Sequence, residues 1–117
     1  MTIELKAEHI GNDYCVMISG GDIPHIGAVA IAQPRPSLQN EEITSASASV
    51  ISVVGHKEDL LAHAVSLRLA ALLNCVVCVN CGIHIDDVKP NQIHVIQKQV
   101  DSLVDALIEQ QNHLNKR

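Results

Sequence analysis

Aromatic side chains are nearly absent from this chain of 117 residues, which has one tyrosine, Tyr14, and neither phenylalanine nor tryptophan. Valine, isoleucine, leucine and alanine must therefore pack the core. Modules that bind single-stranded nucleic acid stack the bases on aromatic rings. The lack of such rings argues against this class of function.

Basic residues are also too few and too scattered to bind a phosphate backbone. Eight lysines and arginines stand against 13 acidic residues, and the formal net charge is −5. Nucleic-acid binding depends on clustered basic side chains, whereas the only adjacent pair here is Lys116 and Arg117. We expect no nucleic-acid partner.

Long apolar runs are missing as well. No stretch approaches the roughly 20 apolar residues that span a bilayer. The first residues, Met1 to Glu4, lack the basic-then-apolar order of a signal peptide. We therefore expect a cytoplasmic protein without membrane contact and, at this length, a single domain over residues 1–117.

Motifs of the common catalytic classes are absent, namely G-x-S-x-G, H-E-x-x-H, the Walker loop and G-x-G-x-x-G. A nucleophile pair of Cys81 and His84 can be drawn, but no oxyanion hole or third orienting group accompanies it. We expect the chain not to be an enzyme. Metal-dependent hydrolysis through His56, His63 and His84 is left as an alternative.

Three of the four cysteines form the pattern C-x-x-C-x-x-C, which resembles part of a zinc or iron–sulfur signature. They occupy an apolar run typical of a buried strand, in which side chains alternate between the two faces. Cys75 and Cys81 would face one way and Cys78 the other, so the three thiolates could not converge on one metal. We interpret these residues as core thiols.

Hydrophobic periodicity predicts an α/β (α+β) fold with the order β-β-β-β-α-β-α. We expect strands at residues 3–10, 14–19, 26–32, 50–54 and 75–80, a loop at 38–48, and a loop or sheet edge at 33–37. Segment 33–37 contains two prolines, and proline cannot donate to a sheet ladder, so we interpret this segment as a loop or a sheet edge.

Two helices complete the predicted fold. The first runs from about residue 57 to 73 with Asn74 as its C-cap, and Pro90 suits the first turn of the second. The second carries a regular apolar stripe made of Ile93, Ile96, Val100, Leu103, Leu107 and Leu114. A right-handed crossover makes the strands near 50–54 and 75–80 parallel. The expected architecture is a mixed, mostly antiparallel sheet with both helices packed on one face.

Glycine and histidine segments follow both strands of this parallel pair. Gly55, His56 and Lys57 open the first helix, and Gly82 and His84 lead toward the second. Ligands of open α/β sheets collect beyond the carboxyl ends of parallel strands, and a helix N-terminus offers unpaired N–H groups to an anion. We expect a phosphate site here, with an ordinary capping turn as the alternative.

Further segments carry candidate ligand contacts. Gly20 and Gly21 allow positive φ before Pro24, although a wide hairpin with a bulge would use the same residues. Arg35, between two prolines, is a candidate for bidentate contact with an anion. Alternating serines at 45, 47 and 49 offer hydroxyls to a phosphate or form a small-residue edge. His56, Asp59 and His63 share a helix face that could bind a metal with His84, or else leave His63 solvated.

Four segments together resemble one small family: Gly20–Ala30, Pro34–Ser37, Gly55–Asp59 and Gly82–Asp86. In this order they resemble the prenylated-flavin chaperone-like proteins, the small third component found with gallate and hydroxyarylate decarboxylases of the UbiD type. The resemblance covers nearly the whole chain. One departure is Asn80 beside Cys81, where small or apolar residues are expected.

The resemblance implies a non-catalytic homodimer that binds prenylated FMN or FMN and holds or delivers it for maturation of a UbiD-type decarboxylase. It implies a fold similar to that of small proteasome-assembly chaperones. The implied cofactor contacts are Gly20, Gly21, His25, Arg35, His56, Lys57, His84 and Asp86, and no catalytic residue or metal ligand is assigned. Without phenylalanine or tryptophan, the flavin ring would lie on aliphatic side chains and backbone. The alternative is a protein-interaction or assembly-chaperone module that uses its long helix and takes no small ligand.

Overall fold

The computed structural model describes residues 2–53 and 58–115, which form one mixed sheet and two helices. The elements follow the predicted order and confirm the α+β class. They are β1 (Ile3–Ile10), β2 (Asp13–Gly21), β3 (Ala28–Pro36), β4 (Thr44–Ser52), α1 (Asp59–Leu73), β5 (Val77–His84) and α2 (Pro90–Asn115).

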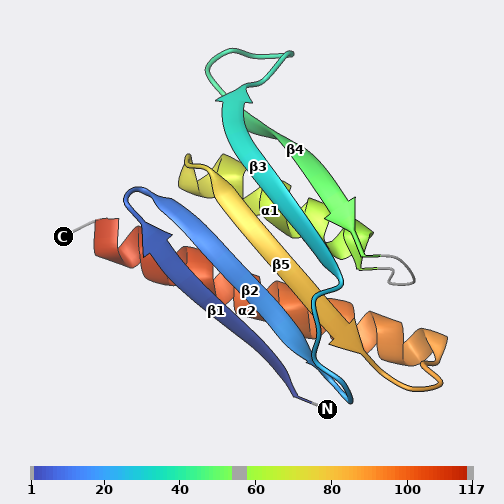
Figure 1. The fold of residues 1–117 in the computed structure, drawn as a ribbon. Helices are drawn as coiled ribbons and strands as arrows, with labels where there is room; N and C mark the ends of the chain where they lie inside the picture. The colour runs from blue at the N-terminus through green and yellow to red at the C-terminus, as the bar shows by residue number, and fades with distance from the viewer. Residues whose placement is uncertain (1, 54–57, 116–117) are drawn as a thin grey trace.

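The five strands lie side by side in the order β1-β2-β5-β3-β4. β5 is parallel to β2 and antiparallel to β3, and the two outer pairs are antiparallel. β4 and β5 are both antiparallel to β3, which lies between them, so the predicted parallel direction of these two strands is confirmed. Both helices lie behind the sheet in Figure 1, with α1 packed on β3, β4 and β5 and α2 on β1.

The prediction of a loop over residues 38–48 is wrong in its second half, because β4 begins at Thr44. Ala46, Ala48 and Val50 turn toward the core, and the serines between them face away from it. Alanine and serine carry little hydrophobic signal. Their alternation is nevertheless the pattern of a strand with one covered face.

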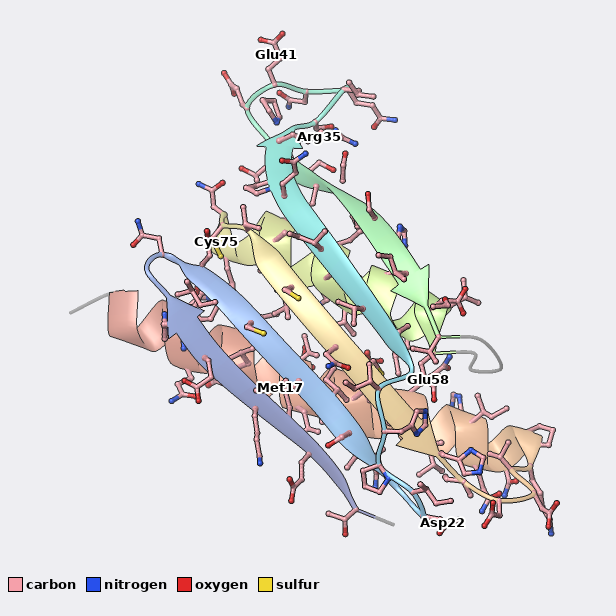
Figure 2. All side chains as sticks on the ribbon, in the orientation of Figure 1. Met17, Asp22, Arg35, Glu41, Glu58 and Cys75 are labelled. Atoms are coloured by element: carbon pink, nitrogen blue, oxygen red, sulfur yellow. The ribbon has the colours of Figure 1, made fainter. Side chains whose placement is uncertain are left out.

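β3 is longer than predicted and continues through both prolines to Pro36. β5 pairs with β3 only as far as Ala32, so residues 33–36 have β4 as their one neighbouring strand. Proline is tolerated at such an edge because a ladder hydrogen bond is not needed on its open side. Figure 2 shows that Arg35 lies at this end of the sheet and Asp22 at the opposite end.

The core lies between the sheet and the helices. Inward residues of β2 and β5 alternate with outward ones, as in any strand with one buried face. The largest fully buried side chains are Val16, Ile18, Leu69, Val77, Val79, Val100 and Val104. The predicted stripe of α2 is correct at Val100 and Leu107, but Val104 is buried in place of the half-buried Leu103. No helix in the described ranges is long and apolar enough to cross a membrane.

The hydroxyl of Tyr14 donates a hydrogen bond to the side-chain carbonyl oxygen of Gln111, and both residues are buried. This bond joins the start of β2 to the last turns of α2. We expect Tyr14→Phe to lower the free energy of unfolding by about 1–3 kcal/mol, because it leaves a buried oxygen without a donor. Urea unfolding measures the loss.

The matched control is the double variant Tyr14→Phe/Gln111→Leu, in which neither polar group remains. It should recover part of the lost stability, since removing both partners of a buried hydrogen bond costs less than removing one. A single variant as stable as the original chain would contradict this role of the bond.

The face of the sheet away from the helices is called the open face below. It carries Cys15 and Met17 from β2, Val29 and Ile31 from β3, and Cys78 from β5. Ile31 is 54% exposed, which shows that no described element covers this face.

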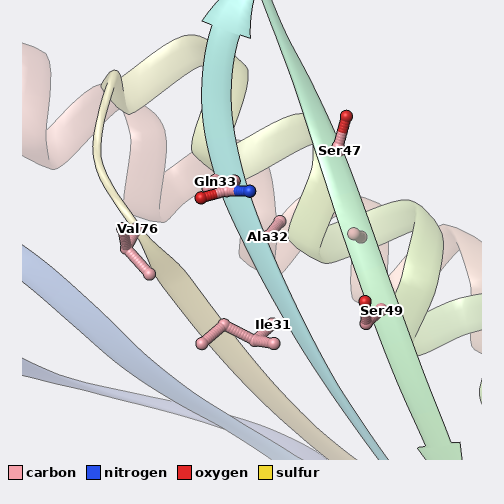
Figure 3. A pocket seen from close by; sticks show the side chains of 7 residues that line it. Ile31, Ala32, Gln33, Ser47, Ser49 and Val76 are labelled. Carbon is pink, nitrogen blue, oxygen red and sulfur yellow. The ribbon is translucent and has the colours of Figure 1, made fainter.

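Where β3 extends past β5, a shallow hollow of about 230 Å³ lies on the open face. Ile31, Ser47 and Ser49 line it together with Gln33 and Val76 (Figure 3). None of its lining residues is basic, although the Arg35 guanidinium donates a hydrogen bond to the hydroxyl of Ser47. A role of the serine hydroxyls in holding a phosphate stays a prediction.

Candidate functional site

The glycine-rich segments predicted at separate places in the sequence pack on one another at one end of the sheet. β2 and β5 are parallel and in register, so Gly21 lies opposite His84. The connection from β2 to β3 then crosses the end of β5. It is held there by the N–H of Asp22, which donates to the His84 carbonyl at 2.7 Å, and by the N–H of Gly27, which donates to the Cys81 carbonyl at 3.1 Å.

At three glycines near this crossing an added Cβ would come within 2.3 Å of a backbone oxygen. A Cβ at Gly82 would lie 1.5 Å from the carbonyl oxygen of His25. Gly21 has a φ of +79°, and its Cβ would lie 2.2 Å from the His84 carbonyl oxygen, while a Cβ at Gly20 would lie 2.3 Å from the backbone oxygen of Thr2. The space that these glycines leave is filled by protein backbone. Direct contact of Gly20 and Gly21 with a cofactor stays a prediction.

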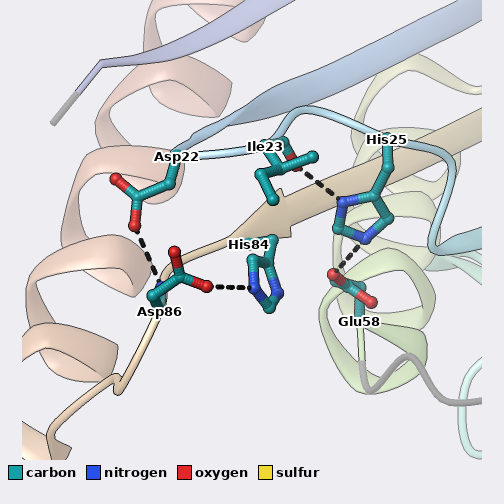
Figure 4. A network of polar contacts seen from close by, with 6 residues as sticks. All are labelled: Asp22, Ile23, His25, Glu58, His84 and Asp86. Atoms are coloured by element: carbon teal, nitrogen blue, oxygen red, sulfur yellow. Dashed lines mark hydrogen bonds and ion pairs between the residues drawn. The ribbon is translucent and has the colours of Figure 1, made fainter.

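His25 is held on both sides of its ring (Figure 4). Its Nδ1 lies 2.9 Å from the carbonyl oxygen of Ile23, and its Nε2 lies 2.9 Å from Oε1 of Glu58. The carbonyl can only accept, so Nδ1 donates. Nε2 and Glu58 then share one proton, as an imidazolium with a carboxylate or as a neutral ring with a carboxylic acid.

His84 forms a second histidine–carboxylate pair beside the first. Its Nε2 lies 3.0 Å from Oδ1 of Asp86, and the Asp86 N–H donates to Oδ2 of Asp22 at 2.9 Å (Figure 4). The rings of His25 and His84 have centroids 6.1 Å apart and an interplanar angle of 71°. Two carboxylate-bound imidazoles therefore lie edge to face at the end of β5.

Glu58 is the one residue of this cluster with an unsatisfied buried atom. Its Oε2 is buried and has no hydrogen-bond partner among the described residues. Burial, and secondarily the charge of this carboxylate, raise the pKa of Cys81 to about 12. A buried carboxylate oxygen needs a donor. This oxygen lies against the backbone of Gly27, where an added Cβ would come within 2.4 Å of it.

A groove adjoins the cluster on the helix side of the sheet, between the first turns of α1 and α2. Its volume is about 750 Å³, within the range of pockets that hold drug-sized ligands. His84 and Glu58 are among its lining residues. Aliphatic residues form most of its walls, namely Leu60, Leu61 and Ala64 of α1, Ile83 of β5, Ile85 and Val88 after it, and Ile93 and Ile96 of α2.

The structure brings together His25, His84, Asp86 and the glycines 20 and 21 of the predicted contacts. Arg35 is not brought to them. It lies seven residues along β3 from Ala28, roughly 23 Å at the usual rise of a strand. There its guanidinium donates to the Ser47 hydroxyl at 2.7 Å and to the Pro36 carbonyl at 3.1 Å.

The predicted phosphate turn at Gly55, His56 and Lys57 lies outside the described residues, and so does part of the alternative metal site. Within residues 2–53 and 58–115, no group of three or more His, Cys, Asp or Glu side chains is placed to hold a metal ion. The prediction missed Glu58 and Asp22. Both stand inside the segments that carried the family resemblance, and that was the available signal.

A family model described as the prenylated flavin chaperone LpdD-like domain matches residues 1–112. A comparison with curated proteins found no match. The matched range includes every segment of the site.

Proposed function

The chain belongs to the prenylated flavin chaperone LpdD-like family, and from this premise we propose that it binds prenylated FMN and supplies it to a UbiD-type decarboxylase without catalysing a reaction itself. The supporting observation is the aliphatic groove beside His84 and Glu58, at the carboxyl ends of the parallel strands β2 and β5. Ligands of α/β sheets bind at this position.

The described residues fit the ring system of a flavin. The ring and its prenyl group have large apolar surfaces, and the walls of the groove offer aliphatic surface to remove them from water. Glu58 also lines the groove, and a carboxylate can accept a hydrogen bond from a ring N–H. After transfer, the flavin would supply decarboxylation chemistry in the partner enzyme, while this chain would only bind and shield it.

The phosphate requires a different environment. Glu58, Asp86 and Asp101 bring carboxylates to the cluster and the groove, and like charges repel a phosphate there. We therefore assign the phosphate to the segment with His56 and Lys57 that precedes α1, as the sequence predicts. Under this assignment the phosphate end of the ligand lies at His56 and Lys57, and its apolar ring lies in the groove.

Titration of the purified chain with reduced prenylated FMN and with reduced FMN, without oxygen, tests the proposal. We expect saturable binding of one ligand per chain, followed by calorimetry or by the flavin absorbance. Lys57→Ala should raise the Kd about tenfold, because it removes one charge-assisted contact to the phosphate.

Lys98→Ala is the matched control, since Lys98 lies on α2 away from the groove. Its Kd should equal that of the original chain. The assignment of the phosphate fails if Lys57→Ala binds normally, and the carrier function fails if no flavin phosphate binds at all.

The second candidate function is an interaction module without a small ligand. Its support is the first part of α2, where Ile93 and Val95 are 47% and 45% exposed. Under this function flavin phosphates would leave the melting temperature unchanged, whereas a bound cofactor raises it.

The homodimer is also part of the proposal. The outer edges of β1 and β4 have no paired strand in the described chain, and such edges favour pairing with a second copy.

A further inference from the structure

Two cysteines lie next to each other on the open face, away from the groove. Cys15 of β2 and Cys78 of β5 are register partners in neighbouring parallel strands. Both are half-buried and free, whereas Cys75 and Cys81 are buried in the core. The open face therefore presents one pair of adjacent thiols.

The distance between the two strands suits a covalent bond between these residues. Paired strands lie about 4.8 Å apart, and disulfides join Cα atoms separated by about 4.4–6.8 Å. Register partners also project their side chains from the same face of the sheet. A disulfide across two neighbouring strands has little freedom to relax, and strained or exposed disulfides are the readily reduced ones.

The surroundings of the Cys78 thiol disfavour its thiolate, which is the nucleophilic form. Burial raises the pKa of Cys78, and the charge of Cys15 and a hydrogen bond with its sulfur raise it further. A thiol with a raised pKa is the slower to attack, so we assign Cys78 as the resolving thiol and Cys15 as the attacking sulfur.

We propose that Cys15 and Cys78 form a dithiol site that hydroperoxides oxidise to a reversible disulfide within the chain. The Cys15 thiolate attacks one peroxide oxygen of H₂O₂, the O–O bond breaks, and the leaving hydroxide takes a proton and departs as water. Cys78 then attacks the sulfenic acid of Cys15, the S–O bond breaks, and the Cys78 proton leaves with the oxygen as a second water. Two thiols lose two electrons and two protons, and one peroxide becomes two waters.

The site does not depend on the proposed flavin function, since its two sulfurs lie on the face opposite the helices that form the groove. Treatment of the full chain with hydrogen peroxide, followed by alkylation of the denatured protein and mass spectrometry, tests it. We expect a mass loss of two hydrogen atoms, a fall from four alkylated cysteines to two, and a peptide that joins Cys15 to Cys78. Dithiothreitol should restore all four thiols.

Single substitutions identify the pair. Cys75→Ser should still form the bond, because Cys75 is buried on the other side of the sheet. Cys78→Ser should lose it, and Cys15 should instead gain oxygen or link two chains. The proposal is overturned if peroxide leaves four free thiols, if the cysteines of the original chain gain oxygen without bridging, or if the bridge joins two separate chains.

Discussion

Gly82→Ala is expected to lower the free energy of unfolding by about 3–5 kcal/mol, a large part of the roughly 5–15 kcal/mol that keeps a typical domain folded. The added Cβ would lie 1.5 Å from the carbonyl oxygen of His25 and 2.4 Å from its carbonyl carbon. These are backbone atoms, so no rotamer change relieves the clash. The crossing segment cannot withdraw easily either, because the N–H of Gly27 is bonded to the Cys81 carbonyl.

Gly11→Ala is the matched control for this prediction. Gly11 has a φ of +61° in the β1–β2 turn, but nothing lies within 4 Å of the position of its Cβ. Alanine there should cost about 1–2 kcal/mol from backbone strain alone. Urea unfolding followed by circular dichroism compares the two variants. Equal losses would show that the crossing over Gly82 is not held tightly.

Ala64→Glu is expected to raise the Kd for reduced prenylated FMN about 100-fold, a loss of about 2.7 kcal/mol of binding free energy. Ala64 is an exposed residue of α1 that lines the groove. A glutamate there would place a carboxylate among aliphatic walls, where it must be desolvated beside the ligand and repels its phosphate. The core is not touched, so the melting temperature of the unliganded chain should change little.

Ala106→Glu makes the same change at an exposed position of α2 that does not line the groove. It adds the same charge to the protein and should leave the affinity unaltered. If both variants bind equally well, the ligand does not use this groove. If both bind weakly, the effect comes from net charge and not from the site.

Local patterns were sufficient to predict most elements of the fold. Gly11 marks the first turn, Asn74 adopts the left-handed conformation with a φ of 52° after α1, and Pro90 opens α2. β4 was placed too late because its first residues are serine and alanine, whose burial depends on the packing of α1. The insertion of β5 between β2 and β3 has no local signature, since pairing partners lie more than 40 residues apart in the chain.

The sequence patterns pointed to only part of the cluster at the end of β5, for the same reason. His25, His84 and Asp86 stand in segments rich in glycine, and those segments do meet at the end of β5. Glu58 and Asp22 were missed because a carboxylate near a helix start or in a turn is common, and its partner becomes visible only when the segments pack. The groove lies between α1 and α2, so its shape depends on how both helices pack on the sheet. No single stretch of sequence encodes that packing.

The central place of β5 has a consequence for biosynthesis. A ribosome produces β1 to β4 well before residues 77–84, so a nascent chain holds two hairpins with no strand to join them. Neither hairpin can close the crossing over Gly82 or complete the mouth of the groove until β5 has emerged and inserted. Under the proposed function, a cofactor could therefore be captured only after nearly all of the polypeptide has been translated, and unfinished chains should not sequester it.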